Sequence, residues 1–138
     1  AFDPSRTFSP TLGGSGDDIA ALNDGIEEFC DRWDARPRQK YFVTMAAEEV
    51  CMAIFNNAFS KADDGEIQVT LVALEDGDFE LHIRDNAALF DPFSLQTGRI
   101  GSREKVDIDA MGILVIKQQA KYFFYRQYQG FNTLVVRI

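Results

Sequence analysis

Apolar residues recur with a helical period through the first part of the chain. Six of them share the spacing of one helix face: Ile19, Leu22, Ile26, Phe29, Cys30 and Trp33. Asp17 suits a helix N-terminus and Arg36-Pro37 ends the pattern, so we predict an amphipathic helix between them. A second helix is predicted from about residue 38 to residue 60, a stretch without Gly or Pro. Its broad face carries Phe42, Met45, Ala46, Glu49, Ala53, Ile54 and Asn57.

The period of the apolar positions then changes to two, which is typical of strands. Apolar and polar residues alternate over 67–73 and again over 79–84, on either side of the acidic stretch 75–78. This pattern predicts an antiparallel hairpin with a solvated acidic turn. Residues 85–108 are irregular, and connections of that length are usually functional or disordered.

The last part of the chain predicts one more helix and one more hairpin. The helix spans roughly Ala110 to Lys121. The hairpin strands are expected at 122–128 and 133–138, with the turn at 129–132. We interpret Trp33 and the late aromatic cluster as core and sheet packing, and His82 as a residue of the polar sheet face.

The predicted order is strand, helix, helix, strand, strand, loop, helix, strand, strand, because residues 6–12 also resemble a short strand. Each hairpin is apolar on one side, so the helices should share one face of the sheet. The predicted fold class is α+β: a two-layer α/β sandwich whose mixed, mostly antiparallel sheet is covered on one face by three helices. We expect residues 1–16 to form an N-terminal segment and residues 17–138 a single domain. The chain begins at Ala1 without a Met, and we expect it to be excised from a longer protein.

Composition narrows the classes of function. The chain has 138 residues, 46% of them hydrophobic, which suits one domain with its own core. Its net charge of −8 disfavours nucleic acid, because binding to phosphates needs a basic surface. Residues 99–138 are the exception, with seven basic against three acidic side chains, which suit one small anion. Two cysteines without metal spacing indicate a cytoplasmic protein, and no apolar run is long enough to insert into a membrane.

One carboxylate lies on the apolar face of the second predicted helix. Glu49, Ala53 and Asn57 are four residues apart and share that face. Glu49 is therefore either a solvated residue at the edge of the apolar stripe or a residue that borders a cavity. The helix pattern leaves both interpretations open.

Two further positions suit ligand contacts. Asp85 ends a predicted strand where the long loop begins, so its carboxylate can accept hydrogen bonds from a ligand or form an ordinary Asx turn. Gly112 begins an apolar helix after Arg99, Arg103 and Lys105. Free N–H groups at a helix start suit phosphate, although a Gly there also permits close helix packing.

In this order, the three segments resemble the ATP-binding domain of the gyrase, Hsp90, histidine kinase and MutL superfamily, and within it the anti-sigma-factor serine kinases. The resemblance covers residues 6–138 and implies a Bergerat-type fold. Glu48-Glu49 resembles the N box of that family, 85–92 the G1 box and 110–113 the G2 box.

The resemblance implies roles for individual residues. Glu49 would be catalytic, polarising the attacking hydroxyl or water, and Asp85 would accept a hydrogen bond from the adenine amino group. Gly112 would lie beneath the phosphates, and residues 91–109 would form the ATP lid. The implied nucleotide-binding set is Asp85, Ala87, Phe90, Arg99, Arg103, Gly112 and Ile113.

Three departures from the family pattern weaken the implied chemistry. Ala53 stands where the family has its Mg²⁺-binding Asn, Ala87 where G1 has a Gly, and Ala110 at the first Gly of G2. We therefore expect no protein ligand for a metal. Asn56 lies on another helix face from Glu49, so it does not replace the missing Asn. ATP or ADP is still expected to bind, with Mg²⁺ poorly held and phosphoryl transfer impaired.

Three functions remain open on these residues. The first is a cytoplasmic regulatory domain that binds an adenine nucleotide and controls another protein: a sigma-factor-like regulator, an antagonist or its own parent domain. The second is a degenerate, nucleotide-free interaction module, forming the cytoplasmic tail of a phosphatase, a sensor or a membrane transporter. The third is an active serine kinase despite Ala53.

Overall fold

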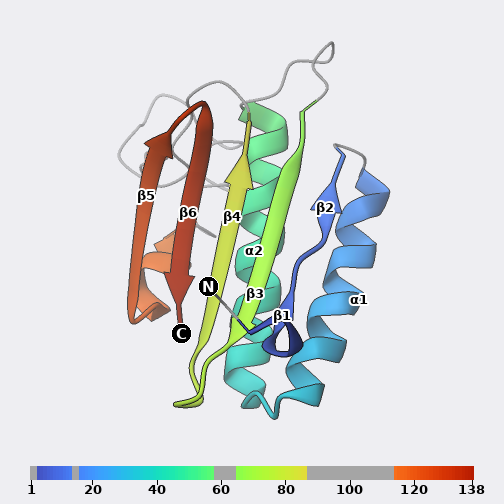
Figure 1. The fold of residues 1–138 in the computed structure, drawn as a ribbon, viewed down its shortest axis with the longest axis vertical. Coiled ribbons are helices and arrows are strands. Elements are labelled where there is room, and N and C mark those ends of the chain that lie inside the picture. Colours follow the sequence, from blue (N-terminus) through green and yellow to red (C-terminus); the bar gives the residue numbers. More distant parts are fainter. Residues whose placement is uncertain (1–2, 14–15, 58–64, 87–113) are drawn as a thin grey trace.

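A computed structural model describes residues 3–13, 16–57, 65–86 and 114–138 of the chain (Figure 1). The elements, in chain order, are a 3-10 turn Pro4–Arg6, β1 Thr7–Phe8, β2 Thr11–Leu12, α1 Gly16–Arg32, α2 Pro37–Asn57, β3 Ile67–Ala73, β4 Phe79–Asp85, β5 Tyr122–Tyr128 and β6 Phe131–Arg137. Residues 114–119, which precede β5, are helical.

The strands form one sheet in the order β1-β3-β4-β6-β5, and β2 also pairs with β3. Every strand pair in the described part of the chain is antiparallel. Figure 1 shows α1 and α2 behind the sheet, and no described helix covers the other face, which we call the open face. The predicted α+β sandwich with its helices on one face is confirmed.

The corner between α1 and α2 follows from its local sequence. Asp34 has a φ of 57°, and Ala35 N–H donates to Cys30 O at 2.9 Å. This is the pattern of an α-helix whose C-terminus is capped by a residue in the left-handed conformation. Pro37 then begins α2. Its missing N–H does not weaken the helix, because the first N–H groups of a helix have no hydrogen-bond partner within it. The Gln39 amide oxygen accepts a hydrogen bond from Arg36 N–H at 2.9 Å, which caps the first turn.

Helix α2 is buried on more sides than its predicted stripe. Phe42, Ala46, Ala53 and Ile54 are buried as expected, but Val43, Ala47, Val50 and Cys51 are buried too. The physical reason is that α2 packs against both α1 and β4. Small residues line much of its surface and allow this close approach.

The second hairpin turns earlier than predicted. The turn consists of Gln129-Gly130 alone, with φ values of 50° and 82°, and Tyr128 pairs directly with Phe131. Two residues with positive φ form the tight turn that suits twisted strands. Phe131 and Asn132, expected in the turn, therefore belong to β6.

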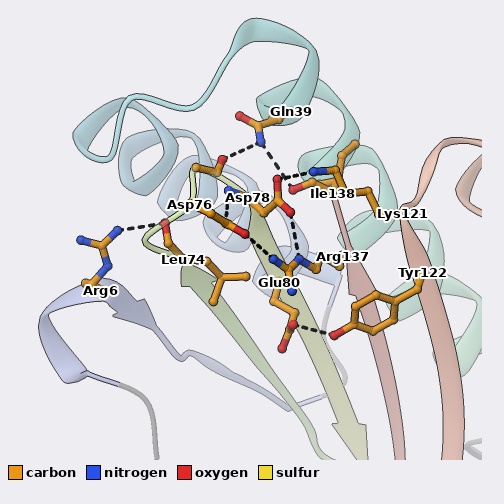
Figure 2. A network of polar contacts seen from close by, with 11 residues as sticks. Arg6, Gln39, Leu74, Asp76, Asp78, Glu80, Lys121, Tyr122, Arg137 and Ile138 are labelled. Atoms are coloured by element: carbon orange, nitrogen blue, oxygen red, sulfur yellow. Dashed lines mark hydrogen bonds and ion pairs between the residues drawn. The ribbon is translucent and has the colours of Figure 1, made fainter.

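The acidic turn between β3 and β4 is more than a solvated loop, which corrects the prediction. Asp78 is only 6% exposed, and its carboxylate accepts from Lys121 Nζ at 2.6 Å and from Arg137 Nε at 2.9 Å. Arg137 also binds Asp76 at 2.6 Å (Figure 2). These cations hold the pKa of Asp78 below its usual value, the Lys121 hydrogen bond contributing most. Basic residues of the last part of the chain thus neutralise this turn.

Candidate functional site

Asp85 ends β4 with its side chain on the helix-covered side of the sheet. Alternation places it on the same side as Leu81 and Ile83, and it is 4% exposed. Its Oδ1 accepts a hydrogen bond from Asn132 Nδ2 at 2.8 Å. Register explains the contact, because Asp85 and Asn132 are directly paired across β4 and β6.

Asn132 is a site residue that our sequence analysis assigned to the turn. It is 1% exposed, on the side of β6 that also carries the buried Leu134 and Val136. The sequence signal for this position is the dipeptide Gln129-Gly130, which suits a two-residue turn. Such a turn places Asn132 in β6, with its side chain on the buried side of the strand. A buried amide that donates to a buried carboxylate is the arrangement expected where a charge is kept out of water.

Helix α2 brings Cys51 near the pair of Asp85 and Asn132. Burial raises the pKa of the Cys51 thiol to about 12, and the negative charge of Asp85 adds to the effect. The thiol is therefore neutral at pH 7 and stays near the carboxylate without competing as an anion. Both Cys30 and Cys51 are buried and free.

Glu49 and Ala53 lie on α2 around Cys51. Glu49 is half-buried, and its neighbour Glu48 faces α1, where Asn23 Nδ2 lies 3.5 Å from Glu48 Oε1. Ala53 is 1% exposed. Helix α2, which carries this segment, packs against β4, the strand that ends at Asp85 (Figure 1).

The other predicted site residues lie outside the described part of the chain: Ala87, Phe90, Arg99, Arg103, Gly112 and Ile113. Lys105, Ala110 and the acidic pair Asp63-Asp64 do so as well. The described site consists of Asp85, Asn132, Cys51 and the Glu49 segment.

A family model described as the histidine kinase-like ATPase domain matches residues 15–138. The chain belongs to this family. The match covers α1 to β6, including each described residue of the candidate site, and the predicted superfamily is confirmed. No curated protein sequence matches the chain.

Solved structures share the fold of this histidine kinase-like ATPase domain. A chain of the SiaB-SiaC complex from Pseudomonas aeruginosa has a TM-score of 0.73 at 16% identity, over 98% of this chain and 91% of that one. The histidine kinase domain of the blue-light activated histidine kinase from Erythrobacter litoralis EL346 has a TM-score of 0.51 at 10% identity. That match covers 85% of this chain and 60% of the other.

The position of the implied magnesium ligand lies in the described part of the chain. Ala53, at the position of the expected Asn ligand, offers only a buried methyl group. In the described ranges, no group of three or more His, Cys, Asp or Glu side chains could hold a metal ion by itself. We therefore derive no chemical step through Mg²⁺.

The remaining candidates are placed as follows. His82 lies half-buried on the open sheet face, 2.8 Å from Glu80 Oε1, as predicted for a sheet-face residue. Trp33 packs against the core with the Arg6 guanidinium 4.5 Å from its ring centre. The late aromatic cluster is divided, which partly corrects its prediction: Phe123 and Tyr125 pack against the core, whereas Tyr122, Phe124 and Tyr128 are exposed.

No helix in the described ranges is long and apolar enough to cross a membrane.

Proposed function

We propose that this chain is a regulatory domain that binds ATP or ADP and controls a partner protein. The observation that carries the proposal is the buried pair of Asp85 and Asn132 at the end of β4. A buried carboxylate is costly unless hydrogen bonds compensate it, and its acceptor oxygens suit a ligand that donates hydrogen bonds. Family membership supports the adenine-binding role that the resemblance implies for Asp85.

The described residues suit recognition of the adenine ring. Asn132 would hold the Asp85 carboxylate in a fixed orientation, and the adenine amino group would donate a hydrogen bond to it. Hydrogen bonds to a charged acceptor in a site without water are among the stronger ones. The neutral Cys51 thiol leaves Asp85 as the negative group there.

Phosphoryl transfer is proposed to be weak. Glu49 would polarise the attacking hydroxyl or water, but transfer depends mostly on positioning and on charge neutralisation. Ala53 supplies no oxygen for a metal that would neutralise the phosphates. Any serine/threonine kinase or ATPase activity is therefore expected to be slow, and the phosphates would depend on Arg99, Arg103 and the backbone at Gly112 and Ile113.

The proposed partner is another protein, in the cytoplasm. The chain's likeness to a member of the SiaB-SiaC complex supports a role in a protein complex, and the sequence resemblance implies the anti-sigma-factor type. Two free, buried thiols agree with a reducing compartment. The net charge of −8 argues against nucleic acid as the partner.

Calorimetry and thermal melting with ATP and ADP, each with Mg²⁺ and with EDTA, test nucleotide binding. Nucleotide at 100 times its dissociation constant should add about 2.7 kcal/mol of stability. Asp85→Asn should weaken affinity roughly tenfold or more, whereas Asp24→Asn, an exposed acid on α1, should not change it. Absence of heat and of a melting shift at millimolar nucleotide would refute the proposal.

Ala53 favours a second function, a nucleotide-free interaction module, and Ala53→Asn distinguishes the two. Ala47→Asn is the matched control, since Ala47 is 0% and Ala53 1% exposed on the same helix. Both variants should lose stability, because each buries a larger polar side chain. If Ala53→Asn gains Mg²⁺-dependent ATP binding and Ala47→Asn does not, the chain has a decayed nucleotide site. If neither variant nor the unmodified chain binds ATP, the nucleotide-free interaction module is favoured.

A further inference from the structure

The open face of the sheet carries an ordered grid of side chains at the β5–β6 end. Register places Arg84 and Arg126 on either side of Thr133, so that the three residues form one row across β4, β6 and β5. The next row contains Phe131 and Tyr128, which are directly paired. On the other side of the arginine row, Val135 lies between His82 and Phe124.

These rows surround a hollow of about 390 Å³. Val135 lies at its base, only 4% exposed although it belongs to the open face. Phe124, Phe131 and Tyr128 are among the lining residues and are 44%, 38% and 65% exposed. The hollow therefore combines an apolar base with aromatic walls, as ligand sites commonly do.

The hollow is also positively charged. Arg84 and Arg126 line it, and no Asp or Glu is among its described lining residues. In the described part of the chain neither arginine forms an ion pair. The Arg84 guanidinium lies 3.8 Å from the centre of the Phe131 ring. Stacking of this kind uses the face of the guanidinium and leaves its in-plane N–H donors for an acceptor.

The charges of the whole chain restrict what can bind there. A polyanion such as single-stranded nucleic acid would also meet the acidic surface of a chain with a net charge of −8. A symmetric pair of copies would bring the arginines of one copy against those of the other. A short segment with one or two carboxylates meets only the local positive charge, and its apolar side chains match the aromatic walls.

We propose that this hollow binds an acidic, extended segment of a partner protein. A Glu or Asp carboxylate of that segment would lie between Arg84 and Arg126, and an adjacent apolar side chain would cover Val135. The outer two of the three strands are about 10 Å apart, a separation that two long arginine side chains span. Arg84 and Asp85 point to opposite faces of β4, so this surface is separate from the nucleotide site and does not depend on it.

A fluorescent ten-residue peptide of alternating Glu and Leu is the probe, and the same peptide with Gln for Glu is its control. The acidic peptide should bind the full chain, with an affinity that falls as salt is added. The double variant Arg84→Gln, Arg126→Gln should weaken binding at least tenfold, as should the Gln peptide. The double variant Arg32→Gln, Arg36→Gln removes the same charge from exposed positions at the end of α1 and should change affinity less than twofold.

Thermal melting establishes that each variant is folded. The proposal is overturned if the acidic peptide does not bind at 1 mM, or if the two double variants lose affinity equally. Tighter binding of a ten-nucleotide oligothymidine than of the peptide would also overturn it. So would sedimentation showing a dimer that the Arg84 and Arg126 changes dissociate, because the occupant would then be a second copy.

Discussion

At the scale of single residues, the candidate site contains a buried hydrogen bond between two polar side chains. Asp85 and Asn132 are 4% and 1% exposed, and the bond between them is 2.8 Å long. Loss of a partner of a buried charged group is costly, because the remaining group has no water to replace it. Asn132 is therefore expected to matter for stability as well as for any ligand that Asp85 binds.

A double-mutant cycle measures this bond. Asn132→Ala should lower the free energy of unfolding by about 1–3 kcal/mol, since it removes a donor from a buried carboxylate. In the Asp85→Ala background the same change should cost less, with a coupling of about 1–2 kcal/mol from urea denaturation at pH 7. Additive effects of the two substitutions would show that the hydrogen bond does not stabilise the fold.

At the scale of elements, the helices and hairpins were predictable because long periodic patterns carry the signal. Two sequence interpretations were wrong where tertiary pairing decides. The turn at Gln129-Gly130 is shorter than predicted, so Asn132 belongs to β6 and not to the turn. The acidic turn appeared solvated because its cations, Lys121 and Arg137, are far away in the sequence. A charge pattern along a chain does not show which distant charge will lie opposite.

The acidic turn predicts a pH dependence of stability. The pKa of Asp78 is lowered in the folded chain. Its ionised carboxylate therefore stabilises the fold above its ordinary pKa of about 3.9, and this stabilisation is lost as pH falls below about 4. Asp78→Asn should lower the melting temperature at pH 7 by a few degrees. It should also make the melting temperature fall less steeply between pH 4 and pH 2.

Asp34→Asn is the matched control, because Asp34 is an exposed acid with no ion pair in the described part of the chain. Equal slopes of melting temperature against pH for Asp78→Asn and for the unmodified chain would contradict the role of the turn (Figure 2).

The N-terminal segment makes a second prediction at this scale. A Cβ at Gly25 would clash with the Phe8 ring, which also stacks on Phe29 with ring centres 6.2 Å apart. Gly25→Ala should therefore destabilise the chain, although Ala is the better helix former by about 1 kcal/mol. In a Phe8→Ala background the same substitution should stabilise it. Chemical denaturation of the four proteins gives the comparison, and a stabilising Gly25→Ala in the presence of Phe8 would contradict it.

At the scale of the whole molecule, the basic residues of the last part of the chain are divided among separate surfaces. Lys121 and Arg137 neutralise the turn at the start of β4, whereas Arg126 joins Arg84 on the open sheet face. The sequence predicts that the positive charge of residues 99–138 suits one small anion, such as the phosphates of a nucleotide. Arg99, Arg103 and Lys105 stay candidates for that role, whereas Lys121 and Arg137 bind the acidic turn and Arg126 lines the hollow.

This division predicts that the two proposed ligands bind independently. Asp85 and Arg84 are consecutive residues with side chains on opposite faces of β4, so a substitution of one leaves the surface of the other in place. Asp85→Asn should weaken ATP binding roughly tenfold or more and leave the affinity for the acidic peptide within twofold. The Arg84→Gln, Arg126→Gln variant should do the reverse. Because coupling between two ligands is reciprocal, a peptide that changes ATP affinity more than about threefold in the unmodified chain would show that β4 transmits binding between its faces.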